Sequence, residues 1–309
     1  MSSYFQELPQ LSSSDVLVQV KSCKLLDICS ETVKELFAKY RQIDIPGAVE
    51  VTGVITETGS QVTSLKHNDR VVVKLPDSID YLLATSVLGD VLHAYTALQY
   101  MARLNIGDVV LILDGVASWA RVTIQLALIW GAKVITVVST MTEKSALEKL
   151  PLPPDVVIVN DSNTLVNDVM EETSGLGVDV VIDNGVCLFP HEDHPDTEMI
   201  KGQFPSKHDI ISTLTVGGRW VTSCPHLQLD PPDCDQLLLR SATVSFLFSQ
   251  TWLLCPSKHG KLQHILGDFA KKLSEKKLQI PQAQWISFTE LLNSVESGVT
   301  IQPGTLIKL

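Results

Sequence analysis

A short loop from Asp114 to Ser118 lies between an apolar run and a helical pattern, and its residue types could bind phosphate. Loops that hold a dinucleotide's pyrophosphate at a helix N-terminus use glycines, because glycine permits tight turns and close approach of backbone N–H groups. This loop contains Gly115, followed by Ser118, with Arg121 in the first turn of the expected helix. We therefore predict that Gly115, Ser118 and Arg121 contact any dinucleotide that binds.

Asp114 opposes that chemistry. A carboxylate at about 4 Å from a phosphate charge costs up to about 4 kcal/mol at an effective dielectric constant of about 20. Arg121 offers an opposite charge, since a guanidinium can grip a phosphate. Alternatively, Arg121 pairs with Asp114 and locks an empty loop. The sequence favours the ion pair and leaves phosphate binding open.

Two further candidate contacts follow expected strand ends. Ser139 comes directly after the run Val134–Val138, with Lys144 a few residues on and no acid at the strand end to accept ribose hydroxyls. That pattern favours NADPH over NADH if a dinucleotide binds. Asn184 comes shortly after the run Val178–Ile182, and its candidacy as a contact with the same ligand is implied by the family resemblance described below. The competing interpretations are a solvent-facing helix residue for Lys144 and a turn residue for Asn184.

Metal chemistry is not expected. The six cysteines form no C-x-x-C pair, so neither a zinc site nor a disulfide framework is indicated. The cluster His191-Glu192-Asp193-His194 lies in a proline-bounded segment without helical i, i+4 spacing, and reads better as an exposed acidic loop that contacts a partner. His93 could donate a proton, but a lone histidine is more often a structural hydrogen-bonding residue.

The elements that must position these residues form an α/β pattern. Short β-branched runs alternate with helical segments, which is typical of a doubly wound parallel sheet of the dinucleotide-binding (Rossmann) kind. The six expected strands are Val109–Leu113, Val134–Val138, Val156–Val159, Val178–Ile182, Trp220–Ser223 and Val244–Phe248.

The rest of the chain predicts a smaller β-rich domain. The expected strands are Val16–Val20, Val49–Thr56, Arg70–Val73, Trp285–Phe288 and Thr305–Leu309. A helix over Thr85–Met101 is expected to lead into the Rossmann domain, and helices His259–Lys272 and Thr289–Glu296 are expected after it. We expect a β-rich domain over residues 1–88, a Rossmann domain over 89–255, and a return of residues 256–309 to the first domain.

Composition limits the partners. The chain has 309 residues, with 24 Lys and Arg against 35 Asp and Glu, which gives a formal net charge of -11. Such a charge repels nucleic-acid backbones, so direct nucleic-acid binding is not expected. Neither a leader pattern nor a membrane-length apolar run is seen, and we expect a cytoplasmic protein.

The motifs resemble the quinone oxidoreductase family of the medium-chain dehydrogenase/reductase superfamily over nearly the whole chain. The matching stretches are Glu50 to Gly59, Asn68 to Val71, Ala94 to Leu98, Gly107 to Leu111, Gln125 to Ala127, Gly131 to Ile135, Gly175 to Asp183 and Gly217 to Arg219. The resemblance implies a GroES-like domain plus a Rossmann domain, with a nicotinamide cofactor between them.

The chain differs from that family at the positions that bind the cofactor and carry out catalysis. The three glycine positions of the family's cofactor loop hold Asp114, Ala117 and Ala120, and Trp119 replaces an aliphatic residue. Leu26 stands where zinc-dependent relatives have a catalytic cysteine, so the resemblance also implies no zinc. The β-rich domain lacks strands of the family, which indicates either a splice or gene-model variant or the loss of a closed cleft.

Two functions remain open, and so does the question of catalysis. The resemblance implies a non-catalytic subunit or scaffold of an endosomal Rab-effector assembly that transports messenger RNA, the FERRY-type complex, with association to early endosomes through partners. The alternative is an NADPH-dependent, zinc-independent reductase of quinones or enones. The family also implies a homodimer through the edge strand Val244–Phe248, and that edge could equally bind another subunit.

Overall fold

A computed structural model describes residues 10–25, 49–71, 80–159, 164–183, 185, 205–280, 285–290, 293 and 306–308. The chain divides into two compact units. The first, called here the β unit, comprises residues 1–30, 42–88 and 281–309. The second, the Rossmann unit, comprises 31–41 and 89–280. The domain bounds expected from the sequence stay a prediction, but by contacts residues 256–280 group with the Rossmann unit.

The β unit is built on one mixed sheet. Its strands are β1 (Val16–Leu25), β2 (Val49–Thr58), β3 (Arg70–Val71), β10 (Trp285–Ser287) and β11 (Leu306–Lys308), in the order β10-β11-β1-β2-β3. All pairs are antiparallel except β10 with β11, which run parallel. The C-terminal strands expected from the sequence therefore do join the N-terminal ones.

Three buried hydroxyls tie this sheet to a helix. Helix α2 (Tyr81–Tyr95) presents Thr85 to strands β1 and β2. The Oγ atom of Ser22 lies 2.5 Å from Thr52 Oγ1 and 2.7 Å from Thr85 Oγ1, and the two threonine oxygens are 2.9 Å apart. All three side chains are buried, and their mutual contacts, with the Tyr81 carbonyl that accepts from Thr85 Oγ1 at 2.9 Å, replace water.

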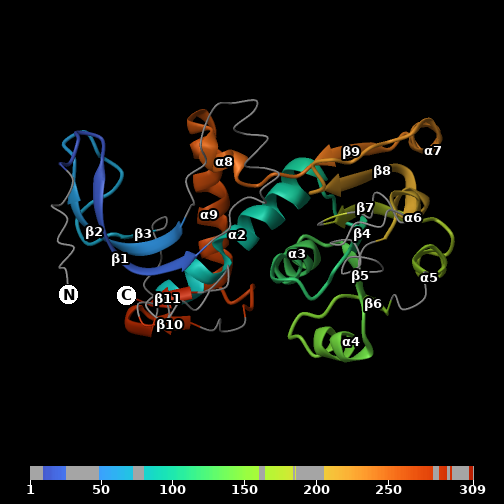
Figure 1. The fold of residues 1–309 in the computed structure, drawn as a ribbon, viewed down its shortest axis with the longest axis horizontal. Helices are drawn as coiled ribbons and strands as arrows, with labels where there is room; N and C mark the ends of the chain where they lie inside the picture. Colours follow the sequence, from blue (N-terminus) through green and yellow to red (C-terminus); the bar gives the residue numbers. More distant parts are fainter. Residues whose placement is uncertain are drawn as a thin grey trace. The chain divides into compact units, whose positions relative to one another are not determined.

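The Rossmann unit has a six-stranded parallel sheet (Figure 1). Its strands are β4 (Val109–Ile112), β5 (Lys133–Val138), β6 (Val156–Val159), β7 (Val178–Asp183), β8 (Leu214–Thr222) and β9 (Thr243–Phe246), in the order β6-β5-β4-β7-β8-β9. The order reverses beside β4, as in a doubly wound dinucleotide-binding fold. The predicted fold class is thereby confirmed.

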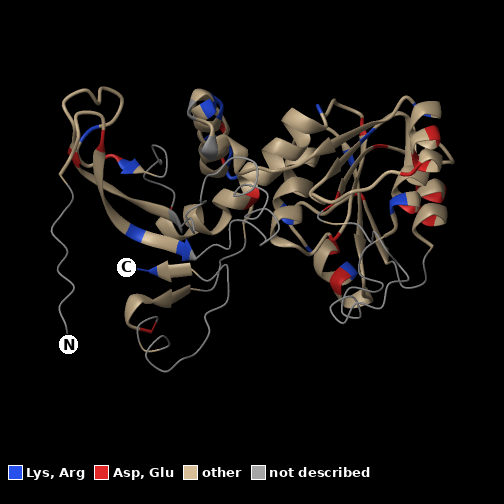
Figure 2. Ribbon diagram, turned by 45° about the horizontal axis from the view of Figure 1, so that its top comes forward, with Lys and Arg blue, Asp and Glu red and all other residues tan. Residues whose placement is uncertain are grey.

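Helices cover both faces of this sheet. Figure 1 shows α3 (Ser118–Ile129) and α4 (Met141–Glu148) on one face, and α5 (Leu165–Glu172), α6 (Lys207–Thr213) and α7 (Pro231–Leu239) on the other. Charged residues lie mostly on helices of this unit, while its strands carry few (Figure 2). The buried cluster includes Leu111, Ile135, Val181 and Trp220, as expected of strands covered on both sides.

Several boundaries differ from the sequence expectation. The helix expected over Thr85–Met101 begins at Tyr81, and its last turns form a π-helix, η1 (Thr96–Met101). The strand expected from Trp220 begins at Leu214, where no β-branched run signals it. The unit also contains α8 (Thr251–Leu254), a 3-10 turn (Pro256–Lys258) and α9 (His259–Ser274). Most of the expected helix Thr289–Glu296, and residues 72–73, lie outside the described residues.

A buried ion cluster joins α6 to α7. Lys207 Nζ donates to Asp230 Oδ2 at 2.7 Å and to Gln228 O at 3.0 Å, and lies 2.8 Å from Asp233 Oδ2. The Asp233 side chain is fully buried, and Asp233 Oδ1 lies 2.7 Å from His208 Nδ1. Although burial acts to raise it, the Lys207 hydrogen bond holds the pKa of Asp233 below its ordinary value. The carboxylate therefore stays ionised in the fold.

We predict that Lys207→Met lowers the free energy of unfolding by about 3 kcal/mol at pH 7, because it removes the ammonium group that lies against the buried Asp233 carboxylate. Urea denaturation measures the loss. The control is Lys144→Met, whose 4.0 Å pair with Glu148 is partly exposed and should contribute less than about 1 kcal/mol. Because the folded pKa of Asp233 is lowered, its stabilisation fades as pH falls, so the Lys207→Met deficit should shrink in acid. Equal losses for the two variants would contradict this assignment.

Candidate functional site

The candidate site is the carboxyl edge of the Rossmann sheet where the strand order reverses. Strands β4 and β7 are neighbours there, and Leu113 N donates to Ile182 O at 3.1 Å just beyond the last β4 residue. In open α/β sheets ligands bind outside the carboxyl ends of the strands at this reversal. The loop from Asp114 to Ala117 leaves β4 at this point and leads into α3.

The loop folds down onto strand β5. Gly115 N donates to Val137 O at 2.9 Å, and Ala117 N donates to Asp114 O at 3.1 Å. A Cβ atom added to Gly115 would lie 2.3 Å from Thr136 Oγ1, which rules out any side chain without a shift. Gly115 is therefore needed for close packing of loop and strand, which is the role of one glycine in dinucleotide loops. Its predicted contact with a cofactor stays a prediction.

Asp114 occupies a conformation that favours glycine. Its φ is 59°, in the left-handed region where aspartate is one of the few tolerated L residues. Burial, and then the nearby negative charge of Glu143, raise its pKa above the ordinary value, while a hydrogen bond from the Ala117 backbone lowers it. A second carboxylate therefore acts on Asp114 from α4.

The predicted ion pair between Asp114 and Arg121 is wrong. No pair within 4.0 Å joins these two described residues, and no positive charge is among the causes of the Asp114 pKa shift. Arg121 lies in the first turn of α3, as expected, but its Nε atom is buried and has no hydrogen-bond partner among the described residues. The helix directs the two side chains to different surroundings, which the sequence spacing did not show.

Glu143 is the site residue that the sequence analysis missed. Its Oε2 accepts from Ser139 N at 2.9 Å and from Thr140 N at 3.0 Å, while Thr140 Oγ1 accepts from Glu143 N at 3.2 Å. This capping box starts α4 at the carboxyl end of β5. The signal was present as Thr140-x-x-Glu143. A carboxylate therefore does lie at the strand end that was taken to lack one.

The other predicted contacts are used within the protein. Ser118 Oγ donates to Asp90 Oδ1 of α2 at 3.2 Å. Lys144 Nζ pairs with Glu148 one turn along the same helix at 4.0 Å, as the solvent-facing alternative expected. The exposed Ser139 supplies its backbone N–H to Glu143. Whether any of these groups contacts a dinucleotide stays a prediction.

Trp119 and His93 fill the space between α3 and α2. Trp119 is only 7% exposed, and its ring centroid lies 4.9 Å from that of His93. Burial lowers the pKa of His93 to about 4, so the imidazole is neutral at pH 7. Trp119 Nε1 and His93 Nε2 are both buried without a partner among the described residues, which is a costly arrangement for two adjacent rings.

Asp183 ends β7 beside the loop. Its buried carboxylate accepts from Trp220 Nε1, from Thr222 Oγ1 at 2.9 Å and from Gly185 N at 2.9 Å. Burial raises the pKa of Asp183 to about 6 despite these donors. The neighbouring Asn184, a predicted cofactor contact, lies outside the described residues.

The sequence predicts no metal site, and the side chains of the described residues bear on that prediction. Within the described ranges, no group of three or more His, Cys, Asp or Glu side chains could hold a metal ion. Leu26 and the segment from His191 to His194 lie outside those ranges. None of the helices in the described ranges is long and apolar enough to cross a membrane.

Solved structures share this fold. An alcohol dehydrogenase superfamily protein from Novosphingobium aromaticivorans aligns with a TM-score of 0.73 at 19% identity, over 98% of this chain and 95% of its own. A putative NADPH:quinone reductase from Bacillus thuringiensis aligns with a TM-score of 0.71 at 17% identity, over 98% and 93%. The fold is that of the medium-chain dehydrogenases/reductases, with GroES-like and Rossmann domains.

Sequence similarity identifies the family within this fold. The chain is 38% identical over 299 aligned positions to mouse quinone oxidoreductase-like protein 1, an alignment that covers 87% of this chain and 84% of the relative. This chain belongs to the quinone oxidoreductase-like protein 1 family. No protein-family model matches it.

We predict that Gly115→Ala lowers the free energy of unfolding by about 1 to 3 kcal/mol, because the new methyl group overlaps Thr136 Oγ1. Thermal or urea denaturation of the variant measures the loss. The matched variant Gly107→Ala adds a methyl group where no atom lies within 4 Å, and reports only the strain of its positive φ of 89°. Combining Gly115→Ala with Thr136→Ala should recover part of the loss, and strictly additive losses would count against the contact.

The pH dependence of stability should reveal Asp183. Its folded pKa of about 6 lies above the ordinary 3.8, so the folded state holds the proton more tightly between these values. Stability should therefore fall by about 2 kcal/mol as pH rises from 4 to 7. Asp183→Asn has no such titration, and it should gain on the natural chain by that amount over the same range. Parallel pH profiles from urea denaturation would contradict the buried-carboxyl assignment.

Proposed function

We propose that this chain is a non-catalytic member of its family that serves as a protein-binding subunit, rather than as a reductase. The observation that carries the proposal is the pair of carboxylates, Asp114 and Glu143, at the sheet edge where a dinucleotide would place its phosphates. The negative charge of Glu143 already acts on Asp114. A pyrophosphate would add further negative charge there, at a cost of a few kcal/mol.

The packing of the loop supports the same conclusion. Ala120 is fully buried and Trp119 nearly so, and Ser118 already donates to Asp90. Three residues at the start of α3 are thus engaged in internal contacts. An ordinary helix N-terminus leaves its N–H groups open to an anion. The loop is therefore better suited to holding α3 against α2 than to receiving phosphate.

A protein-binding subunit needs a surface that contacts its partner, and the β9 edge of the Rossmann sheet is a candidate. β9 is an edge strand of the Rossmann sheet, as predicted, and Phe246 at its end is 57% exposed. At the other end of β9, where α7 leads into it, Val216, Leu238 and Leu239 are each at least 75% exposed, and Gly217 N donates to Arg240 O at 2.7 Å to join β8 to the end of α7. Exposed apolar groups beside an unpaired strand favour association, with a second copy or another subunit.

The assembly proposed is an endosomal Rab-effector complex of the FERRY type that transports messenger RNA, and the chain would reach early endosomes through its partners. RNA contact would belong to other subunits, since the chain carries a formal charge of -11. Size-exclusion chromatography of cell extracts tests it: the protein should elute in a large complex, and elution as a free monomer or dimer would reject it.

The second candidate is an NADPH-dependent, zinc-independent reductase of quinones or enones, and one observation favours it. The buried Nε of Arg121 has no partner among the described residues, at the first turn of a helix where a phosphate could supply one. In that case Arg121 would offset the charge of Asp114.

A ligand-induced shift in the thermal midpoint separates the two candidates. We predict no shift of the natural chain with NADPH or NADH, whereas binding at about a hundred times the dissociation constant would add about 2.7 kcal/mol. The variant Asp114→Gly with Glu143→Gln removes both carboxylates, while glutamine keeps an acceptor for the α4 cap and glycine suits the φ of 59°. A shift that appears only in this variant would assign the block to the two carboxylates. An NADPH shift in the natural chain would overturn the proposal.

A further inference from the structure

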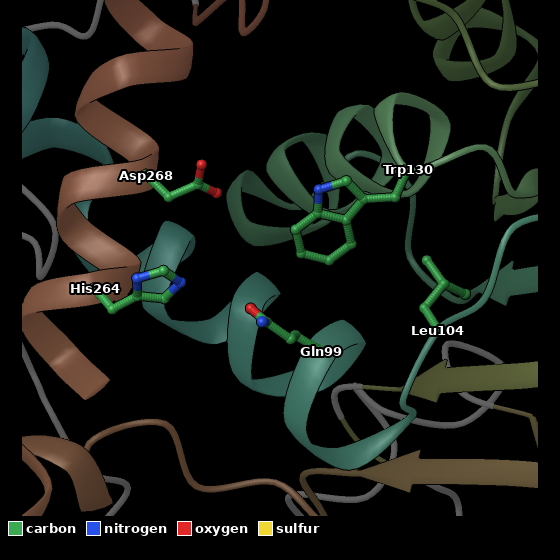
Figure 3. A pocket seen from close by; sticks show the side chains of 5 residues that line it. All are labelled: Gln99, Leu104, Trp130, His264 and Asp268. Atoms are coloured by element: carbon green, nitrogen blue, oxygen red, sulfur yellow. The ribbon is translucent and has the colours of Figure 1, made fainter. Parts of the chain in front are cut away.

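A cavity of about 340 Å³ opens in the Rossmann unit away from the dinucleotide loop, and Gln99, Leu104, Trp130, His264 and Asp268 line it (Figure 3). Its volume is in the range of pockets that hold ligands. The side chains come from three parts of the unit: η1 and the turn after it, the C-cap of α3, and one face of α9. All of them belong to one compact unit.

The cavity is separate from the candidate cofactor site. Helix α3 begins beside the loop at Ser118, and the cavity lies at its other end, at Trp130. Its 12 residues span roughly 18 Å at the usual rise of an α-helix. The two sites can therefore be altered independently.

Irregular backbone builds one wall. The π-helix η1 carries Gln99, and its bonds Ala102 N to Ala97 O (2.8 Å) and Leu104 N to Leu98 O (2.9 Å) form wide turns. Such turns are uncommon and are frequently found at functional sites. Arg219 holds the following turn from the sheet side, donating to Ala102 O at 2.9 Å and to Asp108 Oδ2 at 2.7 Å. Leu104 is thereby fixed at the rim.

Asp268 supplies a carboxylate that is only half used. Its Oδ2 accepts from Tyr95 Oη at 2.5 Å and from Lys272 Nζ, while Oδ1 accepts no hydrogen bond from the described residues. Burial acts to raise the pKa of Asp268, but the Lys272 and Tyr95 hydrogen bonds outweigh it and keep the carboxyl ionised. One oxygen is therefore anchored, and the other is free to accept.

The remaining side chains complete a polar and aromatic lining. Tyr95 contacts Trp130 edge-to-face at a centroid separation of 5.3 Å, which fixes the indole. In Figure 3 the Trp130 ring, the Asp268 carboxylate, the Gln99 amide and the His264 ring face a shared space. Gln99 and His264 make no side-chain hydrogen bond to other described residues, so the cavity offers up to three acceptors around one aromatic face.

We propose that this cavity binds the arginine side chain of a partner protein, an inference that rests on the proposed role as a protein-binding subunit. A guanidinium is planar, stacks on aromatic faces and carries donors that match Asp268 Oδ1 and the oxygen of Gln99. A lysine ammonium would lack the planar stacking, and a neutral aromatic ligand would leave the carboxylate oxygen unmatched. The formal charge of -11 favours a basic partner.

Calorimetric titration of the full chain with N-acetyl-L-argininamide tests the proposal, and we expect a dissociation constant on the order of 1 mM. The matching citrulline amide has the same shape without charge and should not bind measurably. Free L-arginine should bind no more tightly than the blocked amide. Absence of argininamide binding, equal binding of the citrulline amide, or tighter binding of free arginine would each overturn the proposal.

Variants locate the binding. Trp130→Leu should weaken it by about tenfold, through loss of the cation–π contact. Gln99→Ala alters only an exposed side chain and should weaken it severalfold even if Trp130→Leu fails to fold. Gln263 is exposed on α9, the helix that carries His264 and Asp268, but it does not line the cavity. Gln263→Ala should therefore bind as the natural chain does. Unchanged binding in both lining variants would reject the site.

The outcomes separate this inference from the proposed function. Argininamide binding together with an NADPH-induced thermal shift would keep the pocket and reject the non-catalytic role. If neither argininamide nor NADPH binds, the pocket proposal is rejected and the non-catalytic role stands.

Discussion

The hydrogen bond from Gly115 N to Val137 O is the contact on which the candidate site depends. It draws the loop after β4 down onto β5, and only a residue without a Cβ permits that approach. The turn then holds Asp114 at a φ of 59° and starts α3 at Ser118. The same contact thus brings Asp114 near Glu143. One glycine survives from a phosphate-binding loop because packing requires it, whether or not phosphate binds.

Much of the fold could be predicted from the sequence because its strands are short, β-branched runs, a pattern that indicates buried parallel strands. Parallel strands buried on both faces need continuous apolar residues, and the runs that became β4, β5, β6 and β7 have them. The bounds of these four strands shifted by a residue or less. β9 ends two residues before the expected Phe248, and β8 begins early, in a Leu214–Arg219 portion that holds Gly217 and Gly218 and lacks that signature. The π-helix could not be predicted, because Thr96–Met101 has ordinary helical residues and its wide turns depend on contacts such as that of Arg219 with Ala102 O.

The candidate site was predicted less well, since charges were assigned by spacing alone. Asp114 and Arg121 are close in sequence, but helix α3 turns the guanidinium toward buried surroundings. Glu143 is far from Asp114 in sequence and meets it only because β4 and β5 are adjacent parallel strands. Local sequence patterns predict helix caps, and Glu143 belongs to the capping box of α4. They do not tell which other strand end that cap will face, because this depends on the order of strands in the sheet.

Helix α3 connects two different environments, and this suggests how a family fold can change its use. Its first turn is packed by Trp119 and Ala120, so substitutions there are constrained by the interior whether or not a cofactor binds. Its C-cap, Trp130, is only partly buried and borders polar side chains with unused hydrogen-bonding atoms. Surface residues can change without disturbing a core, whereas core residues cannot. In the proposed non-catalytic role, nucleotide selection no longer constrains one end of this helix, and recognition can be acquired at the other.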